Sequence, residues 1–276
     1  MSSPDNWSDP SAAGAVEAAE MAAFLETRGQ FPDQVEVDRT LQTAIAPVTG
    51  ENLLEVGSGS GLLCRQAGAN LGPDGTITGV DISIEMITTA RQLAARQNLG
   101  TRIYFAVASA ERLPYADSSF EGAFAARLLL HLEDPDVVLN EMVRVVRPGG
   151  RIILMDWDFE TVTVDHPDRE LTRRLLNWRT DHYGSNNWSG RQLFRRAQQA
   201  GLKGLWVNPV VTIARDESAG FTHTLWRAAQ RACDAGAISP REQAAWTNDL
   251  KTYIAQGRFF ASITYFIVRG IVEKDP

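Results

Sequence analysis

The stretch LLEVGSGSG at residues 53–61 decides the fold prediction, because it joins a short apolar run to a glycine-rich loop. The apolar run is typical of a buried strand, and Leu62 and the residues after it favour a helix. Glycine permits a tight strand-to-helix turn and lets the backbone approach a ligand closely. The helix that follows offers unpaired backbone N–H groups at its start. The stretch therefore predicts a ligand-binding loop at one end of a strand.

An acidic residue follows the glycine loop at the spacing expected of a nucleoside-binding unit. A second apolar run covers 76–80 and ends at Asp81, twenty positions after Gly61. A carboxylate at the end of that strand can accept hydrogen bonds from both hydroxyls of a ribose. The alternative without a ligand-binding role is a tight turn followed by a solvated aspartate. The loop and the acid together favour a nucleoside-binding crevice.

Strands and helices alternate on both sides of this unit. Strands are expected at 52–56, 76–80, 102–107, 120–126 and 151–157, with helices at 62–71, 83–97 and 137–146. After an insertion at 158–188, the pattern predicts helices at 189–200, 218–235 and 240–256, and strands near 205–213 and 258–268. Two further helices precede the core, at 12–28 and 35–46. The order predicts an α/β fold with a doubly wound, mostly parallel, seven-stranded sheet.

The same pattern suggests one domain over residues 1–276. Within it, residues 1–46 would form an N-terminal helical lid, whose first residues, 1–11, are expected to be a mobile tail or a lid gated by the substrate. Residues 47–157 would bind the cofactor. Residues 158–200 would add a helical cap, and 201–276 the last strands and helices.

Composition narrows the class of protein. Among 276 residues there are 27 basic and 34 acidic side chains, a net charge of −7, and no basic block occurs. An acidic surface disfavours a nucleic-acid partner. Two cysteines are too few for a disulfide framework, which favours a reducing cytoplasm. The polar N-terminus and the lack of a long apolar run predict neither a signal peptide nor a membrane span. We expect a cytoplasmic monomer or homodimer.

The spacing GxGxG after Glu55 resembles the first motif of the class I S-adenosylmethionine (SAM)-dependent methyltransferases. VDIS at 80–83, with Met86 after it, resembles the second motif. Residues 108–125 resemble the third, and 126–158 are similar to the fourth strand, the helix and the fifth strand of the family. The resemblance covers about 50–160, and later segments look like the ubiquinone/menaquinone-biosynthesis-like small-molecule branch. It implies a Rossmann-like methyltransferase fold and SAM as the cofactor.

The resemblance also implies which residues hold the cofactor. Glu55 would bind the amino group of the methionine moiety and Asp81 the ribose. Ile82 and Met86 would pack on the adenine face, with Ala110 and Glu111 at its edge. Close relatives carry Asp where this chain has Ser109, so backbone groups and Glu111 would take over adenine recognition. The expected cofactor-binding set is Glu55, Gly57, Ser58, Gly59, Gly61, Asp81, Ile82, Met86, Ser109, Ala110, Glu111 and Arg127.

Catalytic candidates follow from where ligands lie in such sheets, outside the carboxyl ends of the strands. His131 follows the fourth strand and could act as a general base, or satisfy local backbone groups instead. Arg127 could orient an acceptor carboxylate or form a structural salt bridge. Asp156 and Asp158 are expected to place only one carboxyl in the cleft.

The insertion adds the candidates His182 and Tyr183, expected to reach the acceptor from the lid. Trp157, Trp178 and Trp188 could line a pocket or pack the cap onto the sheet. His166 and His223 are expected at the surface. No cluster of metal ligands is visible, so no metal is expected.

We therefore expect transfer of a methyl group from SAM to an oxygen, nitrogen or carbon atom of a small organic acceptor, with release of S-adenosylhomocysteine (SAH). The acceptor could be aromatic, quinone-like or a natural product of secondary metabolism. One alternative is a SAM-binding protein of this fold that catalyses another reaction, such as a cyclisation. A nucleic-acid methyltransferase is less favoured, because Ala126-Arg127-Leu128 replaces the Asn/Asp-Pro-Pro-aromatic motif. The cofactor motifs argue against a non-catalytic scaffold.

Overall fold

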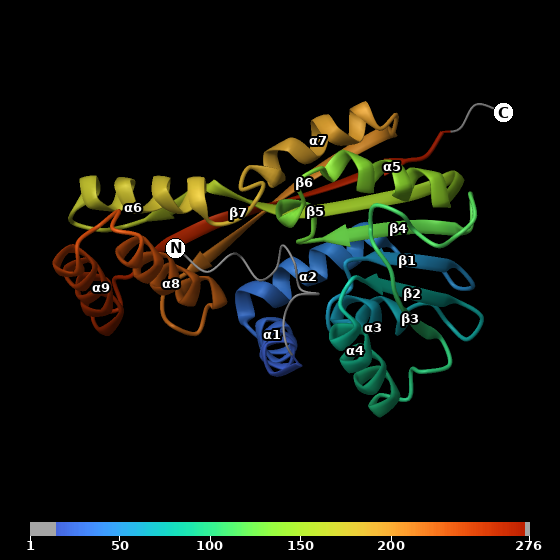
Figure 1. Cartoon of the computed structure of the whole chain (residues 1–276), viewed down its shortest axis with the longest axis horizontal. Coiled ribbons are helices and arrows are strands. Elements are labelled where there is room, and N and C mark those ends of the chain that lie inside the picture. The colour runs from blue at the N-terminus through green and yellow to red at the C-terminus, as the bar shows by residue number, and fades with distance from the viewer. Residues whose placement is uncertain (1–14, 274–276) are drawn as a thin grey trace.

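The computed structural model describes residues 15–273 and shows a seven-stranded sheet flanked by helices (Figure 1). The strand order is β3-β2-β1-β4-β5-β7-β6, and β7 alone runs antiparallel to its neighbours β5 and β6. The strands are β1 (Asn52–Val56), β2 (Thr76–Asp81), β3 (Ile103–Val107), β4 (Phe120–Ala126), β5 (Val146–Val164), β6 (Lys203–Ala214) and β7 (Ala261–Ile271). The expectation of a doubly wound, mostly parallel sheet is confirmed. The tail expected at 1–11 lies outside the described residues.

Helices cover both faces of the sheet. They are α1 (Ala15–Arg28), α2 (Pro32–Ile45), α3 (Leu62–Gly68), α4 (Ile84–Arg96), α5 (Pro135–Val145), α6 (Arg169–His182), α7 (Ser189–Gln199), α8 (Gly220–Asp234) and α9 (Pro240–Ala255), with a 3₁₀ turn η1 (Leu129–His131). In Figure 1, α5 and α7 lie above the sheet, and α2, α3 and α4 lie below it.

Alternation along β1 creates the two core layers. Leu53 packs with Leu41 of α2 and Cys64 of α3, whereas Leu54 packs with Leu139 of α5. Successive strand residues point to opposite faces, so each layer receives every second side chain. Glu55 shares a face with Leu53 and therefore points toward α3.

The chain order reverses between β1 and β4, which are parallel neighbours in the sheet. Helices reached from β1 and from β4 then cover opposite faces, and a crevice opens outside the carboxyl ends of these two strands. The glycine loop follows β1, and Arg127 follows β4. Both expected site segments therefore meet at the same edge of the sheet.

Strand β5 is longer than the sequence pattern indicated. A strand was expected at 151–157, but β5 continues to Val164, where it pairs with Ala261 of β7. The β-branched run Thr161–Val164 supports this extension. The inserted cap consequently begins after residue 164, and its main element is helix α6. Strand β7 also begins three residues later than expected, because Gly257 ends α9 with a positive φ and Arg258 to Phe260 form a loop.

The extended ends of β5, β6 and β7 carry α6, α8 and α9, which form the lobe at the left of Figure 1. Trp246 of α9 is fully buried there and donates a hydrogen bond from Nε1 to Thr172 Oγ1 at 3.0 Å. The expectation that His166 is a surface residue is wrong: the residue is 5% exposed, and its ring stacks on Trp246 at 5.5 Å. His223 is exposed, as expected. The capping box at Ser239 and Glu242 is present.

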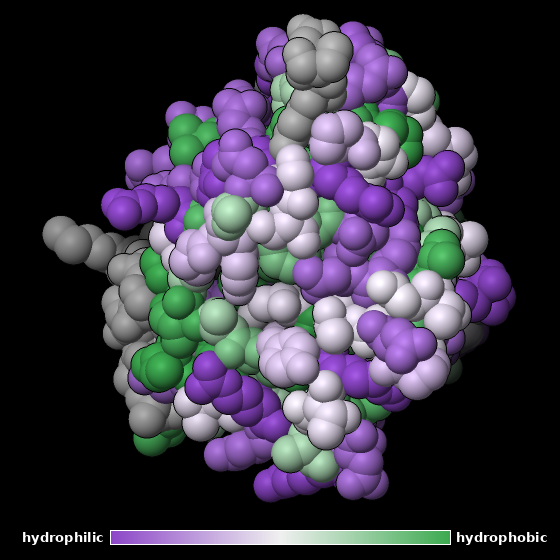
Figure 2. All heavy atoms as spheres, turned by 90° about the vertical axis from the view of Figure 1, so that its right-hand side faces the viewer, coloured by the Kyte–Doolittle hydropathy of each residue, from purple (hydrophilic) through white to green (hydrophobic). Residues whose placement is uncertain are grey.

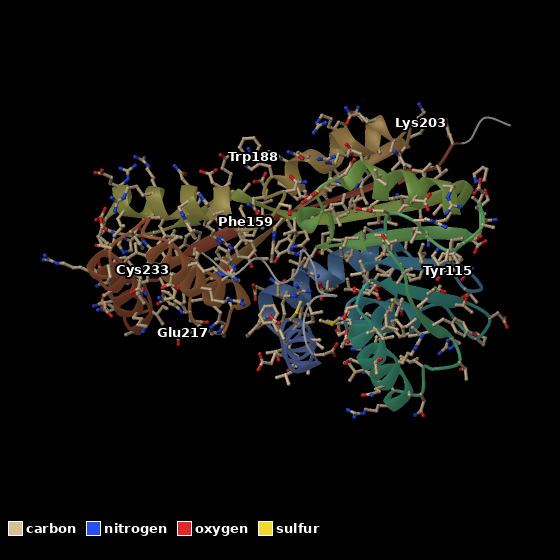
Figure 3. The ribbon with its side chains drawn as sticks, viewed as in Figure 1. Tyr115, Phe159, Trp188, Lys203, Glu217 and Cys233 are labelled. Carbon is tan, nitrogen blue, oxygen red and sulfur yellow. The ribbon has the colours of Figure 1, made fainter. Side chains whose placement is uncertain are left out.

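The two cysteines are free and lie far apart. Cys64 belongs to α3 in the core, and Cys233 lies in the lobe of α8 and α9 (Figure 3). None of the helices within residues 15–273 is long and apolar enough to cross a membrane. The end of the molecule that lies at the right in Figure 1 mixes hydrophilic and hydrophobic side chains (Figure 2).

Candidate functional site

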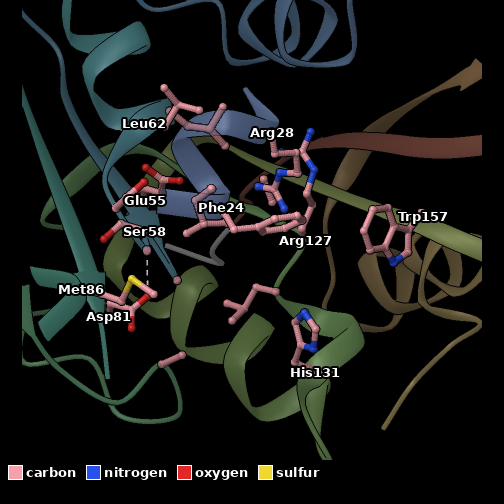
Figure 4. Close-up of a pocket in the computed structure, with 18 of the residues that line it drawn as sticks. Phe24, Arg28, Glu55, Ser58, Leu62, Asp81, Met86, Arg127, His131 and Trp157 are labelled. Atoms are coloured by element: carbon pink, nitrogen blue, oxygen red, sulfur yellow. Dashed lines mark hydrogen bonds between the residues drawn. The ribbon is translucent and has the colours of Figure 1, made fainter. Parts of the chain in front are cut away.

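A cavity of about 290 Å³ opens at the carboxyl ends of β1, β2 and β4 (Figure 4). Helices α1 and α8 and the end of α6 supply its other walls. Most of the residues expected to bind a cofactor line it: Glu55, Gly57, Ser58, Gly59, Asp81, Ile82, Met86, Ser109, Ala110, Glu111 and Arg127. Of the catalytic candidates, His131 and Tyr183 also line it. The structure brings these segments together as the sequence spacing indicated.

The glycine loop adopts a conformation that favours glycine. Gly57, Gly59 and Gly61 have φ values of 75°, 50° and 76°, in the left-handed region that other residues rarely enter. A Cβ atom on Gly59 would lie 2.7 Å from Leu25 Cδ1 of α1. Gly61 does not line the cavity, and a Cβ there would meet the Phe105 ring at 2.5 Å. Gly61 therefore serves the packing of α3 on the sheet.

Asp81 closes the loop from the end of β2. Its Oδ2 accepts a hydrogen bond from the Gly59 backbone N–H at 2.8 Å, and its Oδ1 accepts one from the Ser83 N–H at 3.0 Å. Burial raises the pKa of this carboxyl, although these backbone bonds oppose the shift. The carboxylate faces the cavity with acceptor capacity left over, since each oxygen has two lone pairs.

Glu55 is buried beside the loop and lacks a full set of partners. Its side chain is 2% exposed, and Oε2 has no hydrogen-bond partner among the described residues. Burial raises the pKa of Glu55 to about 8, while hydrogen bonds from Cys64 oppose the shift. Ser58 Oγ, also in the cavity wall, is buried and unpartnered within the described part of the chain. A buried polar atom without a partner is costly, so this corner fits a ligand that carries donors.

A flat apolar wall adjoins Asp81. Ile82 is 47% exposed, while Met86 is 2% exposed and packs against Met21 and Ala22 of α1. Ser109 also lines the cavity, and its Oγ accepts a hydrogen bond from the Glu111 N–H at 3.2 Å. The wall can accommodate a planar ring between apolar side chains and polar groups.

Arg127 follows β4 with a φ of 58°, and its N–H donates to Met155 O at 2.7 Å. Its guanidinium donates to Asp38 Oδ1 at 2.7 Å and lies 5.5 Å from the Tyr265 ring. Both members of the Arg127–Asp38 pair are 5% exposed in their side chains. The salt bridge therefore ties the end of β4 to α2, and Arg127 is also part of the cavity wall.

His131 and Tyr183 approach the cavity from separate elements. His131 ends the 3₁₀ turn after β4, on the same side of the cavity as Arg127 and Trp157 (Figure 4). Tyr183 caps α6 and packs on the Phe159 ring at 4.7 Å.

His182 does not reach the cavity. It is exposed, stacks on Trp178 at 5.0 Å and bonds to Trp178 O through Nδ1. Helical geometry explains the contrast, because adjacent residues point about 100° apart. Among the tryptophans, Trp157 lines the cavity. Trp178 packs against the core, and Trp188 is 46% exposed at the start of α7, in the upper part of Figure 3.

The expectation that one of Asp156 and Asp158 enters the cleft is wrong. Residues two apart in a strand share a face, and both carboxyls point toward α7. Asp156 Oδ2 accepts a hydrogen bond from Ser189 Oγ at 2.5 Å, and Asp158 pairs with Arg191. Burial raises the pKa of Asp156 to about 7. Trp157 between them faces the cavity instead.

Several lining residues escaped the sequence patterns. Helix α8 contributes Gly220, Phe221, Thr224 and Arg227, whose spacing places them on one helical face. Phe24 and Arg28 of α1 and Tyr265 of β7 complete the wall. The spacing of these residues in the sequence shows that they share one face of α8. It does not show that this face lines the same cavity as the glycine loop.

Parts of this sequence match known proteins. Residues 54–154 match the family described as a methyltransferase domain. An uncharacterized 37.1 kDa protein from a transposon of Streptomyces fradiae is 33% identical over 82% of this chain and 64% of its own length. An O-methyltransferase of Penicillium expansum is 31% identical over 58% of this chain and 51% of its own length. A ubiquinone/menaquinone biosynthesis C-methyltransferase of Hahella chejuensis is 34% identical over 41% of this chain. The chain spans 45–64% of the length of these relatives.

Among solved structures, the [4+2]-cyclase SpnF superposes with a TM-score of 0.56 at 22% identity, over 88% of this chain and 83% of that one. This superposition shows a common fold. The matched domain at 54–154 contains the glycine loop, Asp81 and the carboxyl end of β4. The segment at 54–154 therefore matches a methyltransferase domain, and the chain shares the Rossmann-like methyltransferase fold.

Proposed function

We propose that this protein transfers a methyl group from SAM to a small organic acceptor and releases SAH. The observation that carries the proposal is one cavity with two chemically distinct ends. Glu55, Ser58, Asp81 and Met86 cluster at one end, and Arg127, His131 and Trp157 lie at the other (Figure 4). A cofactor and an acceptor can therefore meet between them.

The residues at the first end fit SAM. The unpartnered Glu55 Oε2 suits the amino group of its methionine moiety, and Asp81 suits its ribose hydroxyls. Ile82 and Met86 offer an apolar surface to the adenine, with Ser109, Ala110 and Glu111 at its edge. The positive φ values of Gly57 and Gly59 let the backbone come close. When bound, SAM supplies a methyl group on a sulfonium, which is already a strong electrophile.

The protein's own task is then alignment. Holding a nucleophile in line with the methyl carbon accounts for a large share of a bimolecular barrier. Trp157, Tyr183 and Tyr265 provide rigid aromatic surfaces that suit an aromatic or natural-product-like acceptor. His131 is the candidate base for an acceptor that must lose a proton, because it is the imidazole in the cavity wall. We assign no role in the chemistry to His182.

The proposed division of the chain keeps residues 47–157 as the cofactor-binding core and adds a lid over the acceptor. Helix α1 belongs to the lid and also contacts the cofactor-binding core. Its Leu25 lies against Gly59, and its Glu26 accepts a hydrogen bond from Ser60 Oγ at 2.6 Å. Tyr183 from the cap and the inward face of α8 complete the lid. Its closure would exclude water from the reacting groups. We further propose a cytoplasmic protein of secondary metabolism that acts as a monomer or homodimer.

An activity screen tests the proposal. Purified protein is incubated with SAM and a panel of aromatic and polyketide-like acceptors, and SAH and the mass of each acceptor are followed. We expect SAH to form together with a product that has gained one methyl group. A converted acceptor of unchanged mass, without SAH, would instead support a non-methyl-transfer reaction, as the likeness of fold to a cyclase allows. Failure to bind SAM in calorimetry would rule out both.

A further inference from the structure

We propose that the acceptor is an acid: its carboxylate, phosphate or ionised phenol binds between Arg28 and Arg227 at the end of the cavity away from Glu55. The inference rests on the proposed function, because it describes the second substrate of that reaction. It starts from the distribution of charge around the cavity.

Acidic and basic residues of the cavity wall are separated. The acidic side chains that line it, Glu55, Asp81 and Glu111, come from β1, β2 and the loop after β3. The basic ones, Arg28, Arg127 and Arg227, come from α1, the end of β4 and α8. In Figure 4, Arg28 and Arg127 lie together on the side of Trp157, opposite Asp81. One ligand-binding cavity therefore has an acidic and a basic end.

Asp38 forms an ion pair with only one of the three arginines at the basic end. It pairs with Arg127 at 2.7 Å, whereas Arg28 has no hydrogen bond or ion pair from its guanidinium within residues 15–273. Arg227 lies over the Phe24 ring at 4.9 Å, and it too has no carboxylate partner in the described part of the chain. A cation–π contact of this kind orients a guanidinium without neutralising it. Two of the three lining arginines thus keep their hydrogen-bonding capacity.

A fourth arginine lies directly behind the wall. Arg179 is 2% exposed and stacks on Phe159 at 4.3 Å, with Tyr183 at 5.6 Å and Phe221 at 5.8 Å. Its Nη2 donates to Thr224 Oγ1 at 3.3 Å, but its Nε and Nη1 have no partner among the described residues. Burial lowers the pKa of both Arg28 and Arg179 to about 10, with Arg127 adding to the shift at Arg28.

Repulsion among these cations destabilises this wall of the cavity, in which Arg179 is buried, Arg28 is half-buried and Arg227 is exposed. A buried charge without a counter-ion is costly, and like charges repel strongly where the dielectric constant is low. An anion placed between the arginines relieves both effects and can accept charge-assisted hydrogen bonds from them. The aromatic rings of Tyr183, Phe221 and Trp157 surround the same space. The site therefore suits a negatively charged group on an aromatic or otherwise apolar body.

Two anions could meet this description, the acidic group of an acceptor and the methionine carboxylate of the cofactor. The test separates them by loading the protein with SAH first. Binding of 2-naphthoate, of its uncharged analogue 2-naphthamide and of inorganic phosphate is then measured by calorimetry on SAH-loaded protein. The same titrations are made with Arg28→Gln, Arg227→Gln and Arg28→Lys. Arg241→Gln is the control, since Arg241 is exposed on α9 and does not line the cavity.

We expect naphthoate to bind the SAH-loaded protein at least tenfold more tightly than naphthamide, about 1.4 kcal/mol. Arg28→Gln and Arg227→Gln should remove this preference, while Arg28→Lys retains most of it and Arg241→Gln retains all of it. SAH affinity should change less than threefold in all four variants.

Three results would overturn the proposal. The first is equal affinity for acid and amide, and the second is an acid preference that survives both Gln variants. The third is a loss of SAH affinity in Arg28→Gln with no change in anion binding, which would assign the arginine to the cofactor carboxylate. The proposal is likewise overturned if neither naphthoate nor phosphate shows binding that depends on Arg28 or Arg227. Failure of SAH itself to bind would contradict the proposed function instead, and the anion titrations on cofactor-free protein would still decide this inference.

Discussion

The two ends of the cavity are built in different ways. The cofactor end consists of backbone and short side chains from continuous strand–loop–helix units, such as β1 with its glycine loop and β2 with Asp81. The acceptor end consists of long side chains from α1, β5, α6, α8 and β7, which lie far apart in the sequence. Recognition of a common cofactor therefore depends on local backbone geometry, whereas recognition of the acceptor depends on how distant elements pack together.

The largest expected effect tests the backbone character of the cofactor end. Gly59→Val should weaken SAM binding at least a hundredfold, roughly 2.7 kcal/mol. The side chain would project into Leu25 and the ligand space, and its φ of 50° disfavours a β-branched residue. The control is Gly149→Val, where φ is also positive but no atom lies within 4 Å of an added Cβ. Normal SAM affinity in folded Gly59→Val protein would break the assignment of the loop.

Asp81→Ala should weaken SAM binding roughly ten- to hundredfold, because a charge-assisted hydrogen bond contributes about 1.5–3 kcal/mol. The variant also removes acceptors from the Gly59 and Ser83 N–H groups, so the loop loses its fixed position. Asp117→Ala serves as the control, since that exposed side chain pairs with Arg144 away from the cavity. Calorimetry that found equal affinity in Asp81→Ala and wild type would remove Asp81 from the site.

Acidity should act on the cofactor end through Glu55. Burial raises its pKa from 4.5 to about 8 in the cofactor-free protein, so the folded state holds a proton that the unfolded state loses. This contribution to stability is complete below about pH 4.5 and disappears as the pH rises through 8. A bound ammonium favours the carboxylate, so SAM binding should release a proton and tighten by up to about tenfold per pH unit between pH 5 and 8.

Two variants sharpen that prediction. Glu55→Gln should flatten the pH dependence of SAM affinity. Asp156→Asn should alter the dependence of unfolding on pH but not that of binding, because Asp156 has a pKa of about 7 and faces α7. Heats of binding measured in buffers of different ionisation enthalpy report the proton release. An unchanged slope in Glu55→Gln would show that another group titrates.

The smallest effect belongs to a single aromatic residue of the acceptor end. Tyr183→Leu should lower kcat/KM for an accepted substrate about fivefold, near 1 kcal/mol, through loss of ring contacts with Phe159 and Arg179. SAM affinity should stay unchanged. His182→Ala is the matched control, because its ring lies outside the cavity and both quantities should remain at wild-type values. A larger loss in His182→Ala than in Tyr183→Leu would reverse the roles of the two residues.

The same contrast explains what could be predicted from the sequence. The spacing from Gly61 to Asp81 is local, and it predicted the crevice, while the resemblance to the methyltransferase motifs predicted nearly all residues that line the cofactor end. Gly61 was the exception, since its proximity to Phe105 depends on how α3 packs on β3. Arg28, Arg227 and Tyr265 carry no local signal of function, because each lies in an ordinary helical or alternating pattern. Only the folded chain brings them to one wall.

Strand β5 also bears on how this protein tolerates change over evolutionary time. Trp157 faces the cavity, and its neighbours Asp156 and Asp158 bind α7 on the other side of the sheet. Losing or gaining one residue within β5 would reverse this alternation, placing a carboxylate among the ligands and an indole against α7. Lineages that acquire new acceptors should therefore keep the length of β5 fixed. Their insertions and deletions should gather in the loops on either side of α6, where no strand register is at stake.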